Sequence, residues 1–361
     1  MRSILLKASV ALAAMAIVTA CSSSGGSSSN TSPAAAGSPT SGAAAASTGG
    51  GGGGTGNIKT GLKIAVIPKQ VNQPYFDAAF AGAKKACQEI QAKCDQIGPT
   101  QATGAAQTQF INSAVQQGYN AIVISAADAD SVVPALKKAQ SSGITVVTYD
   151  ADVNDMSARS AMITPTTPQQ IGQYQVKWIA EAIGSGGGEI AILSAAANAA
   201  NQNAWIKYMK QDLPNYPQLK LVDTVYGNDD TTLSTQKAVA LMQAHPNLKG
   251  IISPTTVGIA ASAKYIDSSS YKGKVQVTGL GLPSQMKSFV NDGTVKEFGL
   301  WDPSKLGYLG IYAAAEKISG ANLASSGVTA GGQTYKLDGQ GVVIVGPPQV
   351  FNKDNIDQFQ F

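Results

Sequence analysis

The sequence predicts an α/β fold built on parallel β-sheets, and three observations carry the prediction. From residue 62 onward, short apolar segments alternate with amphipathic ones. Most of the apolar segments are continuous runs of Val, Ile, Leu and Ala, which is typical of parallel strands covered by helices on both faces. About 300 residues follow residue 60, enough for two lobes rather than one. Repeated βα units in two lobes are therefore expected.

The expected strands and helices follow in chain order. The strands span 62–67, 94–97, 121–125 and 145–148, then 189–193, 220–224, 250–252, 275–278 and 297–300. Of these, 94–97 carries the weakest pattern. Amphipathic helices are expected between them, at 74–91, 104–117, 131–141, 168–183, 231–244 and 257–267. Asn72 and Pro74 are typical of a helix start, as an N-cap and a first-turn proline.

Ligands of open α/β sheets bind beyond the carboxyl ends of the strands. The residues that follow the expected strands include Lys69, Asp150, the segment 195–202, Trp301 and Asp302. A lysine, carboxylates, amides, hydroxyls and a tryptophan suit a neutral small molecule that is rich in hydroxyl groups.

The first 60 residues are typical of an export signal followed by a linker. A basic start and an apolar run of about nine residues, too short to span a bilayer, precede Val18–Cys21. This predicts a signal peptide over 1–20. The segment resembles the lipobox of bacterial lipoproteins, in which Cys21 is acylated. The alternative is an ordinary signal peptide that ends near a cysteine. Residues 21–60 are rich in Ser, Gly and Ala, so we expect a flexible tether.

The predicted location is therefore extracytoplasmic, on the outer face of the cell membrane, with attachment through the lipid on Cys21. In such a compartment the other two cysteines, Cys87 and Cys94, could form a disulfide. Two packed thiols are the alternative, because the sequence does not give the distance between their Cα atoms.

Composition argues against several classes of function. The formal charge of +4 among 361 residues leaves no basic footprint for nucleic acid. The single histidine, His245, lies in a polar turn, so no metal site and no cofactor are expected. The glycine-rich segment 184–188 ends a helix and precedes a strand, the reverse of a phosphate-binding loop. No nucleophile elbow or P-loop motif is present, which argues against an enzyme.

Five segments carry a resemblance to a known family. They are Ile64–Lys69, Gly98–Thr100, Gln116–Ile122, Gly293–Asp302 and Phe351–Ile356. In their order and spacing, residues 63–361 resemble the type I periplasmic binding proteins of sugar-type ABC importers. Within that family the chain is most similar to the branch that binds autoinducer-2 and to the related rhamnose-type binding proteins.

The resemblance implies two Rossmann-like lobes joined by a three-segment hinge. The crossings would fall near Ile163, at Trp301–Asp302 and at Gly341–Gly346. The N-terminal lobe would then comprise 61–163 and 302–340, and the C-terminal lobe 164–301 and 341–361, with a further strand over Val342–Val345. Members of the family are expected to act as monomers, close on their ligand by a hinge motion and dock on membrane permease subunits.

The family's polar pocket positions fall on six residues of this sequence. A pocket lysine corresponds to Lys69 and a carboxylate to Asp150, and the remaining four are Asn201, Gln202, Pro254 and Thr256. Two of them depart from the autoinducer-2 branch, which has aspartate in place of Asn201 and alanine in place of Thr256. An amide can donate hydrogen bonds where a carboxylate only accepts them, so these changes leave the ligand open.

Two aromatic residues and a second carboxylate complete the predicted site. Phe76 either covers the apolar face of a sugar ring or packs in the core. Trp301 is expected to form a pocket wall, and Asp302 either accepts a ligand hydroxyl or caps the following helix. Trp205 is expected in the lobe core, and Asp152 as a turn residue or hinge partner.

The expected function is that of a substrate-binding lipoprotein of an ABC importer. It would capture a small sugar or sugar-like molecule, such as autoinducer-2, rhamnose, a pentose, another deoxyhexose or a sugar alcohol. A sensor for a membrane signalling partner is the main alternative. A transcription regulator would need a DNA-binding head where this chain has its leader, and a surface enzyme would need paired carboxylates that flank the substrate.

Overall fold

The computed structural model describes residues 58–361, which belong to one compact unit. The predicted signal peptide 1–20, the predicted lipidation site Cys21 and all but the last three residues of the predicted tether 21–60 lie outside the described residues. Within residues 58–361, none of the helices combines the length and the apolar character that crossing a membrane requires.

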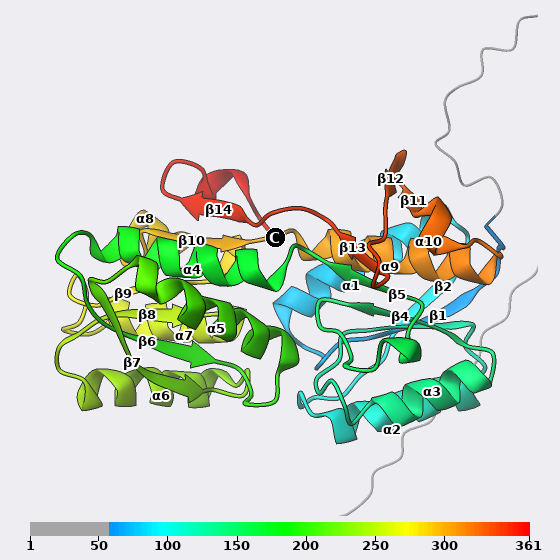
Figure 1. The fold of residues 1–361 in the computed structure, drawn as a ribbon, viewed down its shortest axis with the longest axis horizontal. Helices are drawn as coiled ribbons and strands as arrows, with labels where there is room; N and C mark the ends of the chain where they lie inside the picture. Colours follow the sequence, from blue (N-terminus) through cyan, green and yellow to red (C-terminus); the bar gives the residue numbers. More distant parts are fainter. Residues whose placement is uncertain (1–57) are drawn as a thin grey trace, which may run out of the picture. The chain divides into compact units, whose positions relative to one another are not determined.

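The fold class is α/β with parallel sheets, as predicted. The first sheet, here called the N-terminal sheet, has six parallel strands in the order β13-β5-β4-β3-β1-β2. Helices α1 and α9 cover one face and α2 and α3 the other (Figure 1). The elements are β1 (Lys63–Ile67), α1 (Pro74–Glu89), β2 (Lys93–Gln96), α2 (Gly104–Gln116), β3 (Ala121–Ile124), α3 (Val133–Ser141), β4 (Thr145–Tyr149), β5 (Ala161–Thr164), α9 (Pro303–Ile318) and β13 (Val342–Ile344).

Strand β1 shows why its apolar run is continuous. Ile64 and Val66 belong to the core under α1 and α9, whereas Ala65 and Ile67 belong to the core under α2 and α3. Both sets are fully buried, so each side chain of the strand removes apolar surface from water. Beyond Lys63, strand β1 therefore has no polar face, and the polar groups near it lie past its carboxyl end.

The second sheet, here called the C-terminal sheet, has four parallel strands in the order β7-β6-β8-β9. Helices α4 and α5 pack together, with α4 on β8 and β9, whereas α6 and α7 pack on strands β6 to β9. The elements are α4 (Pro168–Ile183), β6 (Gly188–Ser194), α5 (Ala200–Asp212), β7 (Leu219–Tyr226), α6 (Thr231–Ala244), β8 (Leu248–Ser253), α7 (Thr256–Asp267), β9 (Gln276–Gly279) and α8 (Pro283–Asn291).

Two strand pairs depart from the parallel pattern. Strand β10 (Glu297–Leu300) pairs antiparallel with β14 (Gln349–Asn352), and β11 (Val328–Ala330) forms a hairpin with β12 (Gln333–Tyr335). Short helical turns follow at α10 (Leu323–Ser326) and η3 (Ile356–Gln358), and others lie at η1 (Met156–Ala158) and η2 (Leu213–Asn215). The sequence pattern indicated neither pairing.

The chain passes between the two sheets at three places: between β5 and α4, between β10 and α9, and between β13 and β14. One expectation is wrong here. The strand predicted over Val342–Val345 was assigned to the C-terminal lobe, but β13 pairs with β5 in the N-terminal sheet. Pairing with β13 covers the backbone of β5, which would otherwise be an open edge strand. The third crossing therefore follows Ile344.

A second correction concerns the start of α1. Gln73, not Asn72, occupies the N-cap position, and its side chain makes no capping hydrogen bond. Asn72 adopts a left-handed backbone conformation, with φ of 61°. Pro74 is the first helical residue, as predicted. The amide of Gln73 is consequently free to bind elsewhere.

Cys87 in α1 and Cys94 in β2 have Cα atoms 6.1 Å apart, within the range that a disulfide bridges, and their sulfur atoms are in bonding contact. This geometry favours the disulfide over two packed thiols. Replacing both by alanine should lower the free energy of unfolding by about 2 kcal/mol, through loss of a short cross-link. Urea unfolding checks this, and dithiothreitol should destabilise the native protein but not the variant. A native protein that is insensitive to dithiothreitol would contradict the bond.

Glu297 predicts a pH dependence of stability. Burial and the neighbouring carboxylate of Glu181 raise its pKa from 4.5 to about 7. The folded state therefore binds more protons than the unfolded state between these values, and the free energy of unfolding falls as pH rises from 4.5 to 7. Glu297→Gln should flatten that decline and stabilise the protein above pH 7 by about 1 kcal/mol, after allowance for solvent screening. Thermal unfolding from pH 4 to pH 8 measures the difference.

Candidate functional site

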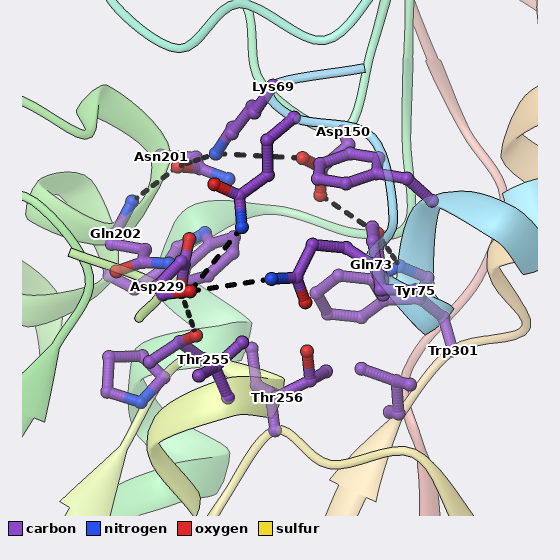
Figure 2. A pocket seen from close by; sticks show the side chains of 17 residues that line it. Lys69, Gln73, Tyr75, Asp150, Asn201, Gln202, Asp229, Thr255, Thr256 and Trp301 are labelled. Atoms are coloured by element: carbon purple, nitrogen blue, oxygen red, sulfur yellow. Dashed lines mark hydrogen bonds and ion pairs between the residues drawn. The ribbon is translucent and has the colours of Figure 1, made fainter. Parts of the chain in front are cut away.

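A cavity lies between the two sheets, at the carboxyl ends of their strands (Figure 2). It is lined from both sides, by loops after β1 and β4 of the N-terminal sheet and after β6, β7 and β8 of the C-terminal sheet. Eight of the nine predicted ligand-binding residues line it. They are Lys69, Phe76, Asp150, Asn201, Gln202, Pro254, Thr256 and Trp301.

Asp302 is the exception. It lies at the N-cap of α9, where its carboxylate accepts a hydrogen bond of 2.9 Å from the backbone N–H of Ser304, and it does not line the cavity. Of the two roles that the sequence left open, the structure selects the helix cap. Although Asp302 directly follows Trp301 in the sequence, its carboxylate contacts the backbone of α9 and not the cavity.

Asp302→Ala should therefore lower the free energy of unfolding by about 1 kcal/mol, the usual cost of losing an N-cap, and leave ligand affinity unchanged. Chemical unfolding and titration calorimetry on the same preparation separate the two effects. A large loss of affinity would return Asp302 to the binding site.

Asp150 is held in the site by a tight turn at the end of β4. Its backbone has φ of 61°, a conformation that aspartate tolerates better than most residues. The carboxylate accepts hydrogen bonds from the hydroxyls of Tyr75 at 2.9 Å and Ser125 at 2.8 Å. Because the side chain is buried, this charge depends on those donors and on Lys69 for its compensation.

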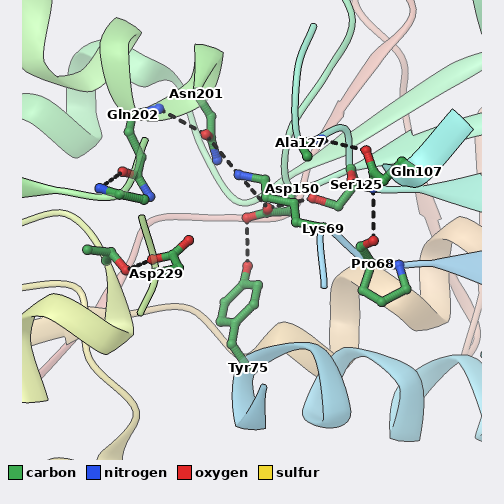
Figure 3. Close-up of polar contacts among 12 residues, drawn as sticks. Pro68, Lys69, Tyr75, Gln107, Ser125, Ala127, Asp150, Asn201, Gln202 and Asp229 are labelled. Carbon is green, nitrogen blue, oxygen red and sulfur yellow. Dashed lines mark hydrogen bonds and ion pairs between the residues drawn. The ribbon is translucent and has the colours of Figure 1, made fainter. Parts of the chain in front are cut away.

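Lys69 connects the two sides of the cavity. Its Nζ lies 3.7 Å from an Asp150 carboxylate oxygen and donates to the Asn201 side-chain oxygen at 3.1 Å (Figure 3). Only 6% of Lys69 is exposed, so its ammonium is not a solvated surface charge. The carboxylate of Asp150 and the amide oxygen of Asn201 together compensate the burial of this ammonium.

Asn201 and Gln202 lie in the first turn of α5, the helix that follows β6, and their amide groups line the cavity. The Asn201 oxygen accepts from Lys69 and from the backbone N–H of Gln202, so its NH₂ group is left to donate. The Gln202 oxygen likewise accepts from Ser194 at 2.6 Å and from the Ala195 N–H at 2.8 Å. Each side chain is thereby oriented by the protein, with its NH₂ available for an acceptor oxygen.

The structure adds a second carboxylate that the sequence analysis missed. Asp229 follows β7 and accepts a hydrogen bond from the Thr255 hydroxyl. Although the residue as a whole is only partly buried, desolvation of its carboxyl group raises its pKa, and nearby Lys69 opposes that rise. The rule of strand carboxyl ends, applied after β7 as it was after the other strands, would have found Asp229.

Gln70, Gln73, Tyr75 and Trp205 also line the cavity and were not predicted as ligand-binding residues. Trp205 was expected in the core. It is buried as expected, yet its ring also borders the cavity, 6.0 Å between centroids from the ring of Trp301. Nothing in its local sequence distinguishes a core tryptophan from a wall tryptophan.

The aromatic wall is oriented by a hydrogen-bond chain. The Trp301 indole N–H donates to the Tyr75 hydroxyl at 2.8 Å, and that hydroxyl donates to Asp150. Burial, reinforced by the charge of Asp150, raises the pKa of Tyr75 well above its usual value, so the hydroxyl stays protonated and can donate. Phe76 packs edge-on against the Tyr75 ring.

The cavity thus combines two carboxylates, one ammonium, several amide and hydroxyl groups and an aromatic wall. Among the described residues that line it, Lys69 is the sole cation. An anionic ligand would be repelled by the two carboxylates and attracted by this one ammonium, so the charge balance disfavours an anion. A neutral molecule with hydroxyl groups on its edges and C–H groups on its faces matches these groups. Over residues 58–361, no cluster of metal-ligating side chains is present.

Asp152 lies outside the cavity and forms an ion pair with Arg159, at 2.7 Å from Nη2. Arg159 also donates to the carbonyl of Gln340, in the segment that leads into β13. Of its two predicted roles, these contacts favour that of a partner near the third crossing.

Residues 64–322 match the family model described as periplasmic binding protein domain. A sugar ABC transporter structure from Actinomyces odontolyticus is 46% identical, with 83% of this chain and 98% of that one covered and a TM-score of 0.67.

Two further structures were solved with ligands. The chain is 33% identical to an ABC transporter solute-binding protein from Clostridium phytofermentas with bound L-rhamnose, over 83% of this chain and 98% of that one, with a TM-score of 0.79. It is 29% identical to LsrB from Clostridium saccharobutylicum in complex with AI-2, over 83% and 100%, with a TM-score of 0.77.

Among curated proteins, the D-apiose import binding protein of Actinobacillus succinogenes is 26% identical over 55% of this chain. That match spans 64% of the apiose protein's own length, slightly under two thirds. These relatives are binding proteins and not enzymes, in agreement with the sequence prediction.

Proposed function

We propose that this chain captures one small neutral sugar or sugar-like molecule and delivers it to the permease subunits of an importer. The chain belongs to the periplasmic binding protein domain family and is a sugar-binding protein of ABC transporters. The observation that carries the proposal is the cavity itself. Its polar groups come from both sheets, so a bound molecule would be held by both at once.

Capture would use three kinds of contact. Asp150 and Asp229 accept hydrogen bonds from ligand hydroxyls. The ammonium of Lys69 and the NH₂ groups of Asn201 and Gln202 donate to hydroxyl or ring oxygens. Trp301 and Phe76 cover the apolar C–H face of the ring. Pro254, in the loop after β8, and Thr256, the first residue of α7, limit the cavity on the C-terminal side.

Closure around the ligand would follow from the three crossings between the sheets. A ligand that contacts both sheets favours the arrangement in which they approach, because only that arrangement makes all its hydrogen bonds. The closed, loaded form would then be the form that docks on the permease. We expect the protein to act as a monomer in this cycle.

The ligand class is supported by the relatives but not narrowed to one compound. The rhamnose-bound and AI-2-bound structures are the relatives whose ligands we would test first. Asn201 adds a donor that an aspartate would lack, and Thr256 adds a hydroxyl where alanine would leave space. Both changes favour a ligand with an additional oxygen near the loops after β6 and β8.

Attachment to the membrane remains part of the proposal. Acylation of Cys21 would hold the protein at the outer face of the membrane, and residues 21–60 would let it reach the permease. Metabolic labelling with a fatty-acid analogue tests this, with Cys21→Ser as the unlabelled control. Equal labelling of both proteins would contradict the anchor.

Ligand identity is tested by thermal shift with L-rhamnose, D-ribose, D-arabinose, D-apiose and autoinducer-2. A ligand present at 100 times its Kd adds about 2.7 kcal/mol of stability, which raises Tm measurably. Mass spectrometry of small molecules that copurify provides an independent reading. If neither method finds a neutral polyhydroxylated ligand, the proposal fails.

A further inference from the structure

A second cavity lies next to the buried one, and the two share four lining residues. We call it the outer cavity. It is lined largely by polar residues, among them Gln101, Thr103, Asn198 and Asp230. The shared residues form the boundary between the two spaces. They are Lys69, Gln70, Gln73 and Asp229.

Two glutamines close this boundary. The side-chain NH₂ groups of Gln70 and Gln73 both donate to one acceptor, the backbone carbonyl of Asp229, at 3.4 Å each. The glutamines belong to the loop after β1 and the start of α1, whereas Asp229 follows β7 of the C-terminal sheet. Figure 2 shows the amide of Gln73 reaching across to Asp229. The contact therefore spans the space between the sheets.

Both sides of the contact depart from local preference. Gln73 is at the N-cap of α1, where Ser, Thr, Asp or Asn would stabilise the helix, yet its side chain leaves the helix uncapped. On the other side, Asn228 and Asp229 are consecutive residues with φ of 54° and 51°, a left-handed conformation that Asn and Asp adopt more readily than other side chains but rarely at two positions in a row. Two independent local costs meet at one contact, which indicates a functional constraint rather than a packing accident.

The contact is better suited to a steric role than to holding the sheets together. At 3.4 Å its hydrogen bonds are at the long end of the normal range and contribute little to stability. The two side chains nevertheless fill the boundary, and Gln70 is only 7% exposed. A ligand extended beyond one ring would need the space that they occupy.

We propose that Gln70 and Gln73, by closing on the Asp229 carbonyl, are specificity-determining residues that restrict the ligand to a single sugar ring. This rests on the proposed function, because it concerns the same buried cavity. Removal of both side chains would join the buried and outer cavities. The joined space would admit a substituent on the sugar, held among the amides and hydroxyls of the outer cavity.

The test compares the native protein with the double variant Gln70→Ala/Gln73→Ala. Gln101→Ala is the matched control, because Gln101 lines the outer cavity but not the boundary. The monosaccharide probes are L-rhamnose, D-ribose and D-arabinose. The extended probes are the α- and β-4-nitrophenyl glycosides of whichever sugar binds, so that both directions of extension are sampled. Affinities come from titration calorimetry, and thermal unfolding confirms that each variant is folded.

We expect the native protein and Gln101→Ala to bind the monosaccharide and to bind both glycosides at least 100-fold more weakly. The double variant should bind the monosaccharide up to 10-fold more weakly than the native protein, and at least one glycoside within 10-fold of the monosaccharide. Discrimination in the double variant equal to that of the native protein would overturn the proposal. Acceptance of the glycosides by the native protein would overturn it as well.

The same data separate this proposal from the proposed function. A native protein that binds autoinducer-2 but none of the three sugars would overturn the single-ring restriction and leave the import role standing. A native protein for which neither the thermal-shift panel nor copurification yields a neutral polyhydroxylated ligand would overturn both.

Discussion

Asp150→Ala is expected to lower ligand affinity at least 100-fold without unfolding the protein. The carboxylate already receives the hydroxyls of Tyr75 and Ser125 and lies beside Lys69. A carboxylate has about four lone-pair positions, so at least one remains for a ligand hydroxyl. Alanine removes that acceptor and also leaves the buried ammonium of Lys69 without its carboxylate. A 100-fold loss corresponds to about 2.7 kcal/mol, within reach of one buried charged hydrogen bond and one disrupted ion pair.

The control for this prediction is Asp150→Asn. Asparagine adopts the left-handed backbone conformation at this position more readily than alanine, so it isolates the charge from the turn. We expect asparagine to preserve stability better than alanine and still to lose most of the affinity, because an NH₂ group would face hydroxyl donors. Titration calorimetry gives the affinity and thermal unfolding the stability. An Asp150→Ala protein that binds its ligand with native affinity would show that the site lies elsewhere.

The fold class was predictable because burial on both faces of the sheets leaves a direct trace in the sequence. In the run of β1 every residue after Lys63 is apolar and buried, and each predicted run corresponds to an observed strand. The short strand β5 was missed because Ala161–Thr164 mixes small, flexible and polar side chains. Strand β13 was assigned to the wrong lobe because pairing partners at a crossing are set by tertiary contacts and not by the strand's own pattern.

The site was predictable where a residue directly follows a strand that was examined for it. Lys69 and Asp150 are of this kind. Gln73 could not be found in that way. It is at the N-cap position of α1, and the sequence does not show that its side chain leaves the helix uncapped and instead contacts Asp229. Asp302 shows the converse: its position suggested the cavity, whereas the nearest donor was the backbone of its own helix.

Tyr75→Phe is the most informative test of how the cavity wall is oriented. The Tyr75 hydroxyl accepts from the Trp301 indole N–H and donates to Asp150, so it connects the aromatic wall to the principal acceptor. Tyr75 is 8% exposed and Trp301 is 5% exposed, so water has little access to replace the lost group. Phenylalanine keeps the ring and its packing but leaves one buried donor and part of a buried carboxylate unsatisfied. Such groups cost about 1–3 kcal/mol each.

We therefore expect Tyr75→Phe to lower the free energy of unfolding by about 2 kcal/mol and ligand affinity about 30-fold. The affinity falls because Trp301 is no longer fixed as a face for the sugar ring and because Asp150 loses a donor that orients it. Urea unfolding and calorimetry measure the two effects. The matched control is Tyr119→Phe, which removes a hydroxyl bonded to Asp95, away from the cavity, and should leave affinity unchanged. Equal affinities for native protein and Tyr75→Phe would show that the indole and the carboxylate are positioned independently, and that the chain through Tyr75 stabilises the fold alone.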